Sequence, residues 1–387
     1  MSFRRTAQIR AIPVLCAMAV AILLSAPCSQ AQEKLSFRID DEVTRFALSG
    51  DGRIAYAVRH VFSEKKIQLQ RDDLWIAERD GKKRRILLGE KFVRGSGPFS
   101  YLVRGLRWSP DSAKLTVDLA TSEMINEDGD TREGAMTLLL DGAGGEIPIA
   151  VGDSVIAGAT NAAWLGDGSA IVYLTAVQPE PPSPRPGEPP NKEASFIVNL
   201  LRPFAGPGSP IFSGHKFVAA AWNSATNSGA AIERSPTGNT TLLALDLGKE
   251  TSRDLATLDR YAGGLTISPS GDKVAYWVSN EQLEVRDVAS PNRVTRVRVI
   301  LGTLGWAGDE KRILVKQGAA GKSGSLVWIS LPQLAPMAPG TTPATQDVAL
   351  QSILHDLEFR QFEISPDGKS LAVVEPGRRN LLVYSLP

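Results

Sequence analysis

Short apolar runs alternate with turn residues along the sequence, and the clearest example lies near the C-terminus. The stretch Phe362-Glu363-Ile364 has apolar residues on either side of one glutamate, residues 371–374 are all apolar, and a Ser-Pro-Asp-Gly turn at 365–368 lies between them. Apolar and β-branched residues favour pleated strands. Proline presets the backbone for the second position of a turn, and aspartate and glycine fit the positions that follow. The pattern therefore predicts a β-hairpin.

The same pattern recurs along the chain, with further copies beginning near residues 46, 106, 163, 221, 265 and 304. The copies follow one another at roughly 40–60 residues, which is the period of a four-stranded propeller blade. A third strand follows each hairpin, and most units have a fourth, as at 146–151, 253–258 and 294–300. The sequence therefore predicts an all-β fold, a seven-bladed β-propeller of four-stranded antiparallel blades.

The last predicted unit ends after its third strand, residues 381–386, whereas residues 35–39 form a spare strand before the first unit. Pairing these two strands would close the ring and remove the exposed edges of an open sheet. We therefore expect the N-terminal strand to be the outer strand of the last blade.

Residues 1–31 have the pattern of a bacterial export signal. An apolar run at 11–24 follows a basic start and precedes a small-residue cleavage site at 29–31. This run is too short to favour a permanent membrane span. Both cysteines, Cys16 and Cys28, lie in this segment, and Pro27 disfavours lipid attachment at Cys28. We expect a periplasmic or secreted mature chain without thiols and without a transmembrane segment.

The mature chain, residues 32–387, is predicted to form one propeller domain because the repeats run along its whole length. Two stretches interrupt them. The Pro-rich stretch 178–191 is interpreted as a solvated loop in preference to a recognition segment. Residues 332–348 are interpreted as an extended connection to the last blade.

Charge excludes some classes of partner. The chain has 43 basic and 42 acidic side chains, and removing the three arginines of the export signal leaves 40 against 42. Such a balance creates no strong field of one sign, so neither nucleic acid nor an anionic membrane surface is expected to bind. We expect a monomer.

The repeated hairpin carries a family resemblance, strongest at residues 108–111, 268–276 and 365–374. It resembles the WD-like PD repeat of TolB-type periplasmic propellers and is similar to the propeller half of prolyl oligopeptidase family enzymes. The resemblance implies a propeller over nearly all of the mature chain and leaves the function open, because such propellers host unrelated activities. The chain departs from TolB in lacking an N-terminal α/β domain and in having seven units instead of six. It departs from the peptidases in ending where their hydrolase domain would begin.

Candidate catalytic groups are few. No Gly-x-Ser-x-Gly motif offers a hydrolase nucleophile. His60, His215 and His355 could meet at a propeller mouth to bind a metal, but histidines so isolated in sequence are more typical of surface or capping positions. We therefore predict no catalytic residue, no metal and no cofactor.

Aromatic residues recur at one position of the repeat. Four units have a tryptophan where the others have leucine or isoleucine: Trp108, Trp164, Trp222 and Trp306. An aromatic cage for a ligand would not tolerate aliphatic substitutes at equivalent positions. The position therefore predicts packing between blades.

The candidate binding site follows from topology. Residues just before each innermost strand should ring one mouth of the channel, which we call the basic mouth: Arg45, Arg104, Asn161, Lys216, Tyr261 and Arg360. Its cations could receive an acidic peptide segment or a carboxylate ligand, since arginine offers a two-pronged donor. The alternative is an ordinary polar rim.

Two functional classes remain open. The first is a non-catalytic, exported propeller of the cell envelope that binds a protein or peptide. The second is a propeller enzyme, a lactonase-type hydrolase or a metal-dependent lyase, with its site at the channel mouth. The scattered histidines favour the binding module.

Overall fold

The computed structural model describes most of the chain after residue 33. The described residues are 34–64, 66–92, 97–126, 129–149, 153–177, 195–203, 207–235, 238–317, 324–338, 341–357, 361–375 and 379–386, without the side chains of 355–357. The export signal, the Pro-rich stretch 178–191 and Arg360 lie outside these ranges. None of the helical segments in this part of the chain has the length and apolarity of a membrane span.

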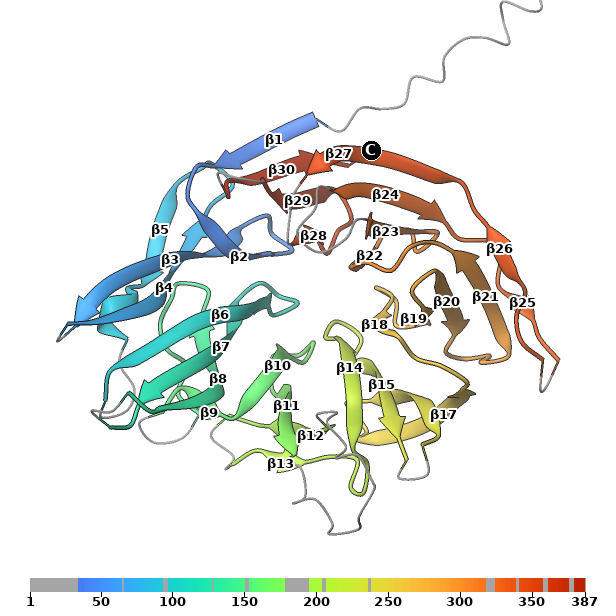
Figure 1. The fold of residues 1–387 in the computed structure, drawn as a ribbon, viewed down its shortest axis with the longest axis horizontal. Helices are drawn as coiled ribbons and strands as arrows, with labels where there is room; N and C mark the ends of the chain where they lie inside the picture. Colours follow the sequence, from blue (N-terminus) through green and yellow to red (C-terminus); the bar gives the residue numbers. More distant parts are fainter. Residues whose placement is uncertain are drawn as a thin grey trace, which may run out of the picture.

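The described chain forms seven blades around a central opening, as predicted (Figure 1). From the innermost strand outward, blade 1 contains β2 (Val43–Leu48), β3 (Ile54–Glu64), β4 (Ile67–Ala77) and β5 (Lys83–Leu87). Blade 2 contains β6 (Phe99–Trp108), β7 (Lys114–Met124), β8 (Thr131–Asp141) and β9 (Val155–Ala157). Blade 3 contains β10 (Ala159–Trp164), β11 (Ile171–Val177), β12 (Ser195–Leu201) and β13 (Ser209–Pro210). A 3-10 turn, η1 (Gly89–Lys91), follows β5.

The remaining blades follow the same plan. Blade 4 contains β14 (Phe217–Asn223), β15 (Ser228–Arg234), β16 (Thr240–Asp246) and β17 (Thr251–Leu258), and blade 5 contains β18 (Gly263–Ile267), β19 (Lys273–Ser279), β20 (Gln282–Asp287) and β21 (Arg293–Arg298). Blade 6 contains β22 (Leu304–Trp306), β23 (Arg312–Gln317), β24 (Gly324–Ser330) and β27 (Leu350–Leu357). Blade 7 contains β28 (Phe362–Ile364), β29 (Ser370–Val374), β30 (Leu381–Ser385) and β1 (Lys34–Ile39).

The predicted closure of the ring is confirmed. β1 pairs antiparallel with β30, with Lys34 opposite Ser385 and Ile39 opposite Leu381, and the two strands lie side by side in Figure 1. Ile39 is fully buried in an apolar cluster formed by blades 7 and 1. The first strand therefore completes the last blade and helps to bury the contact with its neighbour.

The predicted fourth strand of blade 2, residues 146–151, is wrong. The outer strand is β9, further along the chain, and Glu146 forms only an isolated bridge with Leu140. Pro148 has no N–H to give to a ladder, so it disfavours a continuous strand at that place.

The predicted connection at 332–348 contains strands of its own. β25 (Ala335–Pro336) pairs antiparallel and β26 (Thr345–Asp347) pairs parallel with β21, the outer strand of blade 5. The chain then returns to blade 6 as β27. We call the described residues 332–338 and 341–347 the strap, because they tie two blades together.

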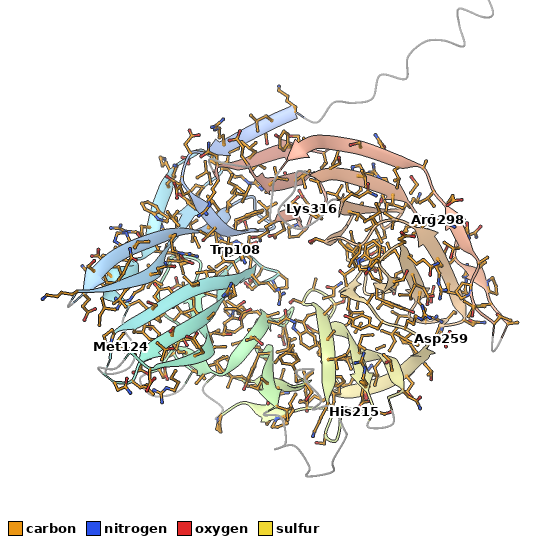
Figure 2. The ribbon with its side chains drawn as sticks, viewed as in Figure 1. Trp108, Met124, His215, Asp259, Arg298 and Lys316 are labelled. Carbon is orange, nitrogen blue, oxygen red and sulfur yellow. The ribbon has the colours of Figure 1, made fainter. Side chains whose placement is uncertain are left out.

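The recurring tryptophans pack between blades, as predicted. Trp108, Trp164 and Trp306 are buried, and the Nε1 of Trp108 donates to Ala47 O of the preceding blade at 3.2 Å. Trp222 does the same to Asn161 O at 2.7 Å. Trp108 accordingly lies close to the central opening, whereas Met124, at the far end of β7, lies at the periphery (Figure 2).

Candidate binding site at the channel mouth

The innermost strands share an irregularity near the basic mouth. A register shift interrupts the pairing between the innermost strand and the next strand in five blades, those of β2, β6, β10, β14 and β18. In β2 the shift lies between Val43 and Arg45, and in β6 it lies between Val103 and Gly105. A β-bulge bends the strand and re-aims side chains, and such bulges are frequent beside functional sites. Arg45 and Arg104 were expected just before the innermost strands, but they lie inside β2 and β6, at these bulges.

Arg45 and Arg104 lie next to each other. The Nε of Arg45 donates to Arg104 O at 3.2 Å, and its Nη1 donates to Thr44 O at 2.8 Å. The Arg104 side chain is exposed, and no carboxylate in the described part of the chain pairs with it. The two bulges therefore bring together two cationic residues from different blades.

Asn161 has a mainly structural role. Its φ of 52° is in the left-handed region, which asparagine tolerates better than most residues. Its Oδ1 accepts from Arg107 Nη2 at 3.0 Å, and its Nδ2 donates to Ala220 O at 3.1 Å. Asn161 thus joins blades 2, 3 and 4, and its amide group is already occupied.

The other predicted residues lie elsewhere. Lys216 and Tyr261 precede β14 and β18, across the opening from blade 1 (Figure 1). Lys216 is exposed and lies beside Glu233, which accepts from its backbone N–H, while Tyr261 packs partly buried against the apolar cluster of blades 4 and 5. Arg360 lies outside the described residues. The structure thus brings Arg45 and Arg104 into contact and places Lys216 and Tyr261 on the other side.

Three charged residues near the channel were missed in the sequence. Burial lowers the pKa of Arg107, opposed by the nearby carboxyls of Asp118 and Glu363. Burial also raises the pKa of Asp118, and it raises the pKa of Glu363 to about 8. Arg107 and Glu363 keep some accessible surface although protein surrounds them, so their removal from water is incomplete.

The sequence contained a signal for Arg107 and Glu363. Arg107 and Glu363 occupy the repeat position just before the recurring Trp, Leu or Ile. The other repeats have only small residues there: Ala47, Ala163, Ala221, Thr266 and Gly305. A charge at a position that otherwise holds small residues distinguishes blades 2 and 7 from the rest.

His60 and His215 lie in different blades and do not meet. The Nε2 of His60 lies 2.8 Å from Glu90 in blade 1, and the Nδ1 of His215 lies 3.0 Å from Glu233 in blade 4. The side chain of His355 is not among those described. Within the described ranges, no three His, Cys, Asp or Glu side chains gather in a way that could hold a metal ion.

Comparison with known proteins identifies the fold. No protein-family model matches the sequence, and no curated protein matches it significantly. The structure resembles a chain of the mitotic checkpoint complex (TM-score 0.57, 14% identity, covering 100% of this chain and 99% of that one). It also resembles the β-propeller domain of Cps50 (Swd1) from Myceliophteria thermophila (0.53, 10%, 92% and 100%) and the C-terminal WD40 domain of Sif2 (0.51, 13%, 92% and 99%). The chain is therefore a WD40-like propeller, and identities this low show the fold alone.

Proposed function

We propose that the protein is an exported, non-catalytic binding module that takes up an acidic protein or peptide segment at the basic mouth. The observation that carries the proposal is the contact between Arg45 and Arg104 at adjacent bulges, with the Arg104 side chain exposed. The exposed Arg104 guanidinium can donate two parallel hydrogen bonds to a carboxylate. Arg45, whose Nε and Nη1 donate to Arg104 O and Thr44 O, adds a second positive charge beside it.

The repeated hairpins, best conserved in form at residues 108–111, 268–276 and 365–374, support a relationship to TolB-like propellers of the cell envelope. The pattern of residues 1–31 supports export to the periplasm or beyond. N-terminal sequencing of the exported protein should then begin at Gln32. An intact N-terminus on protein recovered from the cytoplasm alone would contradict export.

Peptide binding tests the proposed site. We expect the purified protein to bind a fluorescent Asp/Glu-rich peptide, measured by anisotropy, and not a Lys-rich peptide of equal length. Replacing Arg45 and Arg104 by glutamine should weaken binding about tenfold or more, because two charge-assisted contacts are lost. The residual binding should also depend less on salt.

Lys249→Gln with Arg298→Gln provides a matched control, because it also removes two exposed cations but from blades 4 and 5. Equal affinity in both double variants would contradict the proposed site. Turnover of a lactone or ester panel by the wild type would favour the propeller enzyme instead.

A further inference from the structure

A polar cavity of about 550 Å³ lies between blades 4 and 5, away from Arg45 and Arg104 in blades 1 and 2. The end of β17 forms one wall, the face of β19 to β21 forms the other, and the strap covers it through Met337, Thr341, Thr342 and Pro343. Asp259 and Arg298, labelled in Figure 2, mark this side of the ring. Pockets that take small molecules commonly have volumes of about 300–1,000 Å³.

A row of polar side chains crosses the blade 5 wall. Tyr276, Glu284 and Arg296 stand opposite one another on β19, β20 and β21, so they share one face of the sheet. The Oη of Tyr276 donates to Glu284, and Arg296 Nη2 donates to Glu284 Oε2 at 2.7 Å. Arg286 Nη2 donates to Glu284 Oε1 at 2.6 Å. Arg296 Nε is a fourth donor, at 3.2 Å from Glu284 Oε2. All of the roughly four acceptor sites of the Glu284 carboxylate are therefore occupied.

This cluster holds an excess positive charge. Two guanidinium groups share one carboxylate, while Glu284 and Arg286 are only 1% and 6% exposed. The buried Nε of Arg286 has no acceptor among the described residues. Buried donors almost always have a partner, and a buried charge is costly unless it is compensated. The two arginines and one glutamate of the wall therefore carry a net positive charge that a bound anion would balance.

The rim and the roof are suited to an anionic ligand. Arg260 lies at the rim, is exposed, and forms no ion pair within the described part of the chain, whereas Asp259 is the acidic residue beside it. The roof is held in place because Arg296 pairs with Thr345 in the β21–β26 ladder. Gln282 Nε2 also donates to Thr345 Oγ1 at 3.2 Å. A fixed roof over a charged wall is a preformed site.

We propose that this cavity binds a small anionic ligand, through carboxylate or phosphate oxygens that accept hydrogen bonds from Arg286 and Arg296. The site contains none of the basic-mouth residues and lies away from Arg45 and Arg104, although Tyr261 directly follows Arg260 in the chain. Either anion satisfies the chemistry of the wall, since guanidinium groups match both.

Calorimetric titration of the full protein tests the proposal. Inorganic phosphate and succinate serve as probes, and glycerol is the uncharged comparison. We expect saturable binding of at least one anion and none of glycerol. Binding of phosphate alone assigns a phosphate ligand, binding of succinate alone assigns an organic acid, and binding of both supports the shared chemistry. Saturable binding of neither anion would overturn the proposal.

Two pairs of variants locate the binding. Arg296→Gln should weaken it about tenfold or more, whereas Arg298→Gln, an exposed position on the same strand, should leave it unchanged. Thr342 lines the cavity from the roof and is exposed, so substitutions there should not disturb folding. Thr342→Glu should weaken anion binding because it adds a competing carboxylate, and Thr342→Gln, of equal size, should not. Equal affinity in the two Thr342 variants would contradict the assignment even where Arg296→Gln fails to fold.

Discussion

Blades 1 and 2 and blades 4 and 5 both bury charged residues, but they satisfy them in different ways. In the first pair, Arg71 is 1% exposed and donates from Nε to Phe99 O at 2.6 Å and from Nη1 to Glu90 O at 2.9 Å. Its guanidinium group also lies 4.7 Å from the centre of the Phe62 ring. The neighbouring Asp72 accepts from Val103 N at 2.8 Å and pairs with Arg59.

The difference lies in what completes each network. Backbone groups of blade 2 and of η1, together with Arg59, satisfy Arg71 and Asp72. The two blades join there in one sheet through the pairing of Arg71 with Tyr101. Beside the cavity between blades 4 and 5, Arg286 donates to Glu284 and to Pro291 O, but its buried Nε has no acceptor among the described residues. This incomplete network is the basis for the proposed ligand site, whereas the completed network between blades 1 and 2 is structural.

The largest effect should come from breaking the completed network. Asp72→Ala removes the acceptor of a buried N–H and leaves Arg59 without its partner, so it should cost about 3–5 kcal/mol of unfolding free energy. Urea unfolding followed by circular dichroism measures this loss. A loss below about 1 kcal/mol would show that the network is not structural.

A methyl group should distinguish the close-packed interface from the open one. A Cβ at Gly89 would lie 3.0 Å from Arg71 Cβ and 3.2 Å from Asp73 Oδ1, so Gly89→Ala should cost about 1–3 kcal/mol. Ala256 borders the cavity, so Ala256→Val should change stability by no more than about 0.5 kcal/mol. Equal losses in the two variants would contradict the difference in packing.

A third buried charge lies near the channel, where protein encloses the Glu363 carboxyl and the hydrogen bonds to it do not offset the cost of burial. Its Oε1 accepts from Leu48 N at 3.1 Å, yet burial raises its pKa from 4.5 to about 8. Between these two values the folded protein keeps a proton that the unfolded chain releases, so stability should fall as the pH rises from 4.5 to 8.

Glutamine cannot ionise and keeps the shape of the side chain. Glu363→Gln should therefore match the wild type near pH 5 and exceed it near pH 9 by about 1–2 kcal/mol, since partial exposure reduces the full effect. Urea unfolding at the two pH values measures the difference. Equal stability of the variant and the wild type at both pH values would show that burial does not raise the pKa of Glu363.

The smallest effect is expected at the surface beside the cavity. Arg298 and Asp347 form an ion pair at 2.9 Å, with side chains 62% and 85% exposed. Arg298→Gln should change the unfolding free energy by about 0.5 kcal/mol or less, because water screens such pairs. A larger loss would mean that this pair, and not the strand pairing, holds the strap on blade 5.

Features encoded locally could be predicted from the sequence. The turn at 365–368 and its copies indicate hairpins because their residues determine the backbone geometry, and their spacing gives the number of blades. The tryptophan position also indicated its own burial, because aliphatic residues replace it in other repeats. Closure by the first strand followed from counting strands.

Features that depend on register could not be predicted in this way. Tyr276, Glu284 and Arg296 share a face only because two ladders align them, and no short stretch of sequence contains that alignment. The strap looked like a connection because its strands are two and three residues long and pair with another blade. The sequence pattern placed Arg45 and Arg104 just before the innermost strands, whereas they lie inside β2 and β6, at bulges that became visible only in the structure.

The pairing of β1 with β30 also constrains when the protein can fold. Ser36 Oγ donates to Val383 O at 2.9 Å across 347 positions of the chain, and contacts of such separation form slowly because a long loop must be closed first. During synthesis, β1 has no partner until β30 has emerged, so the ring closes only after residues 381–385 are available. A chain stalled before residue 381 would leave the backbone N–H and C=O groups of β1 open to pairing with another copy.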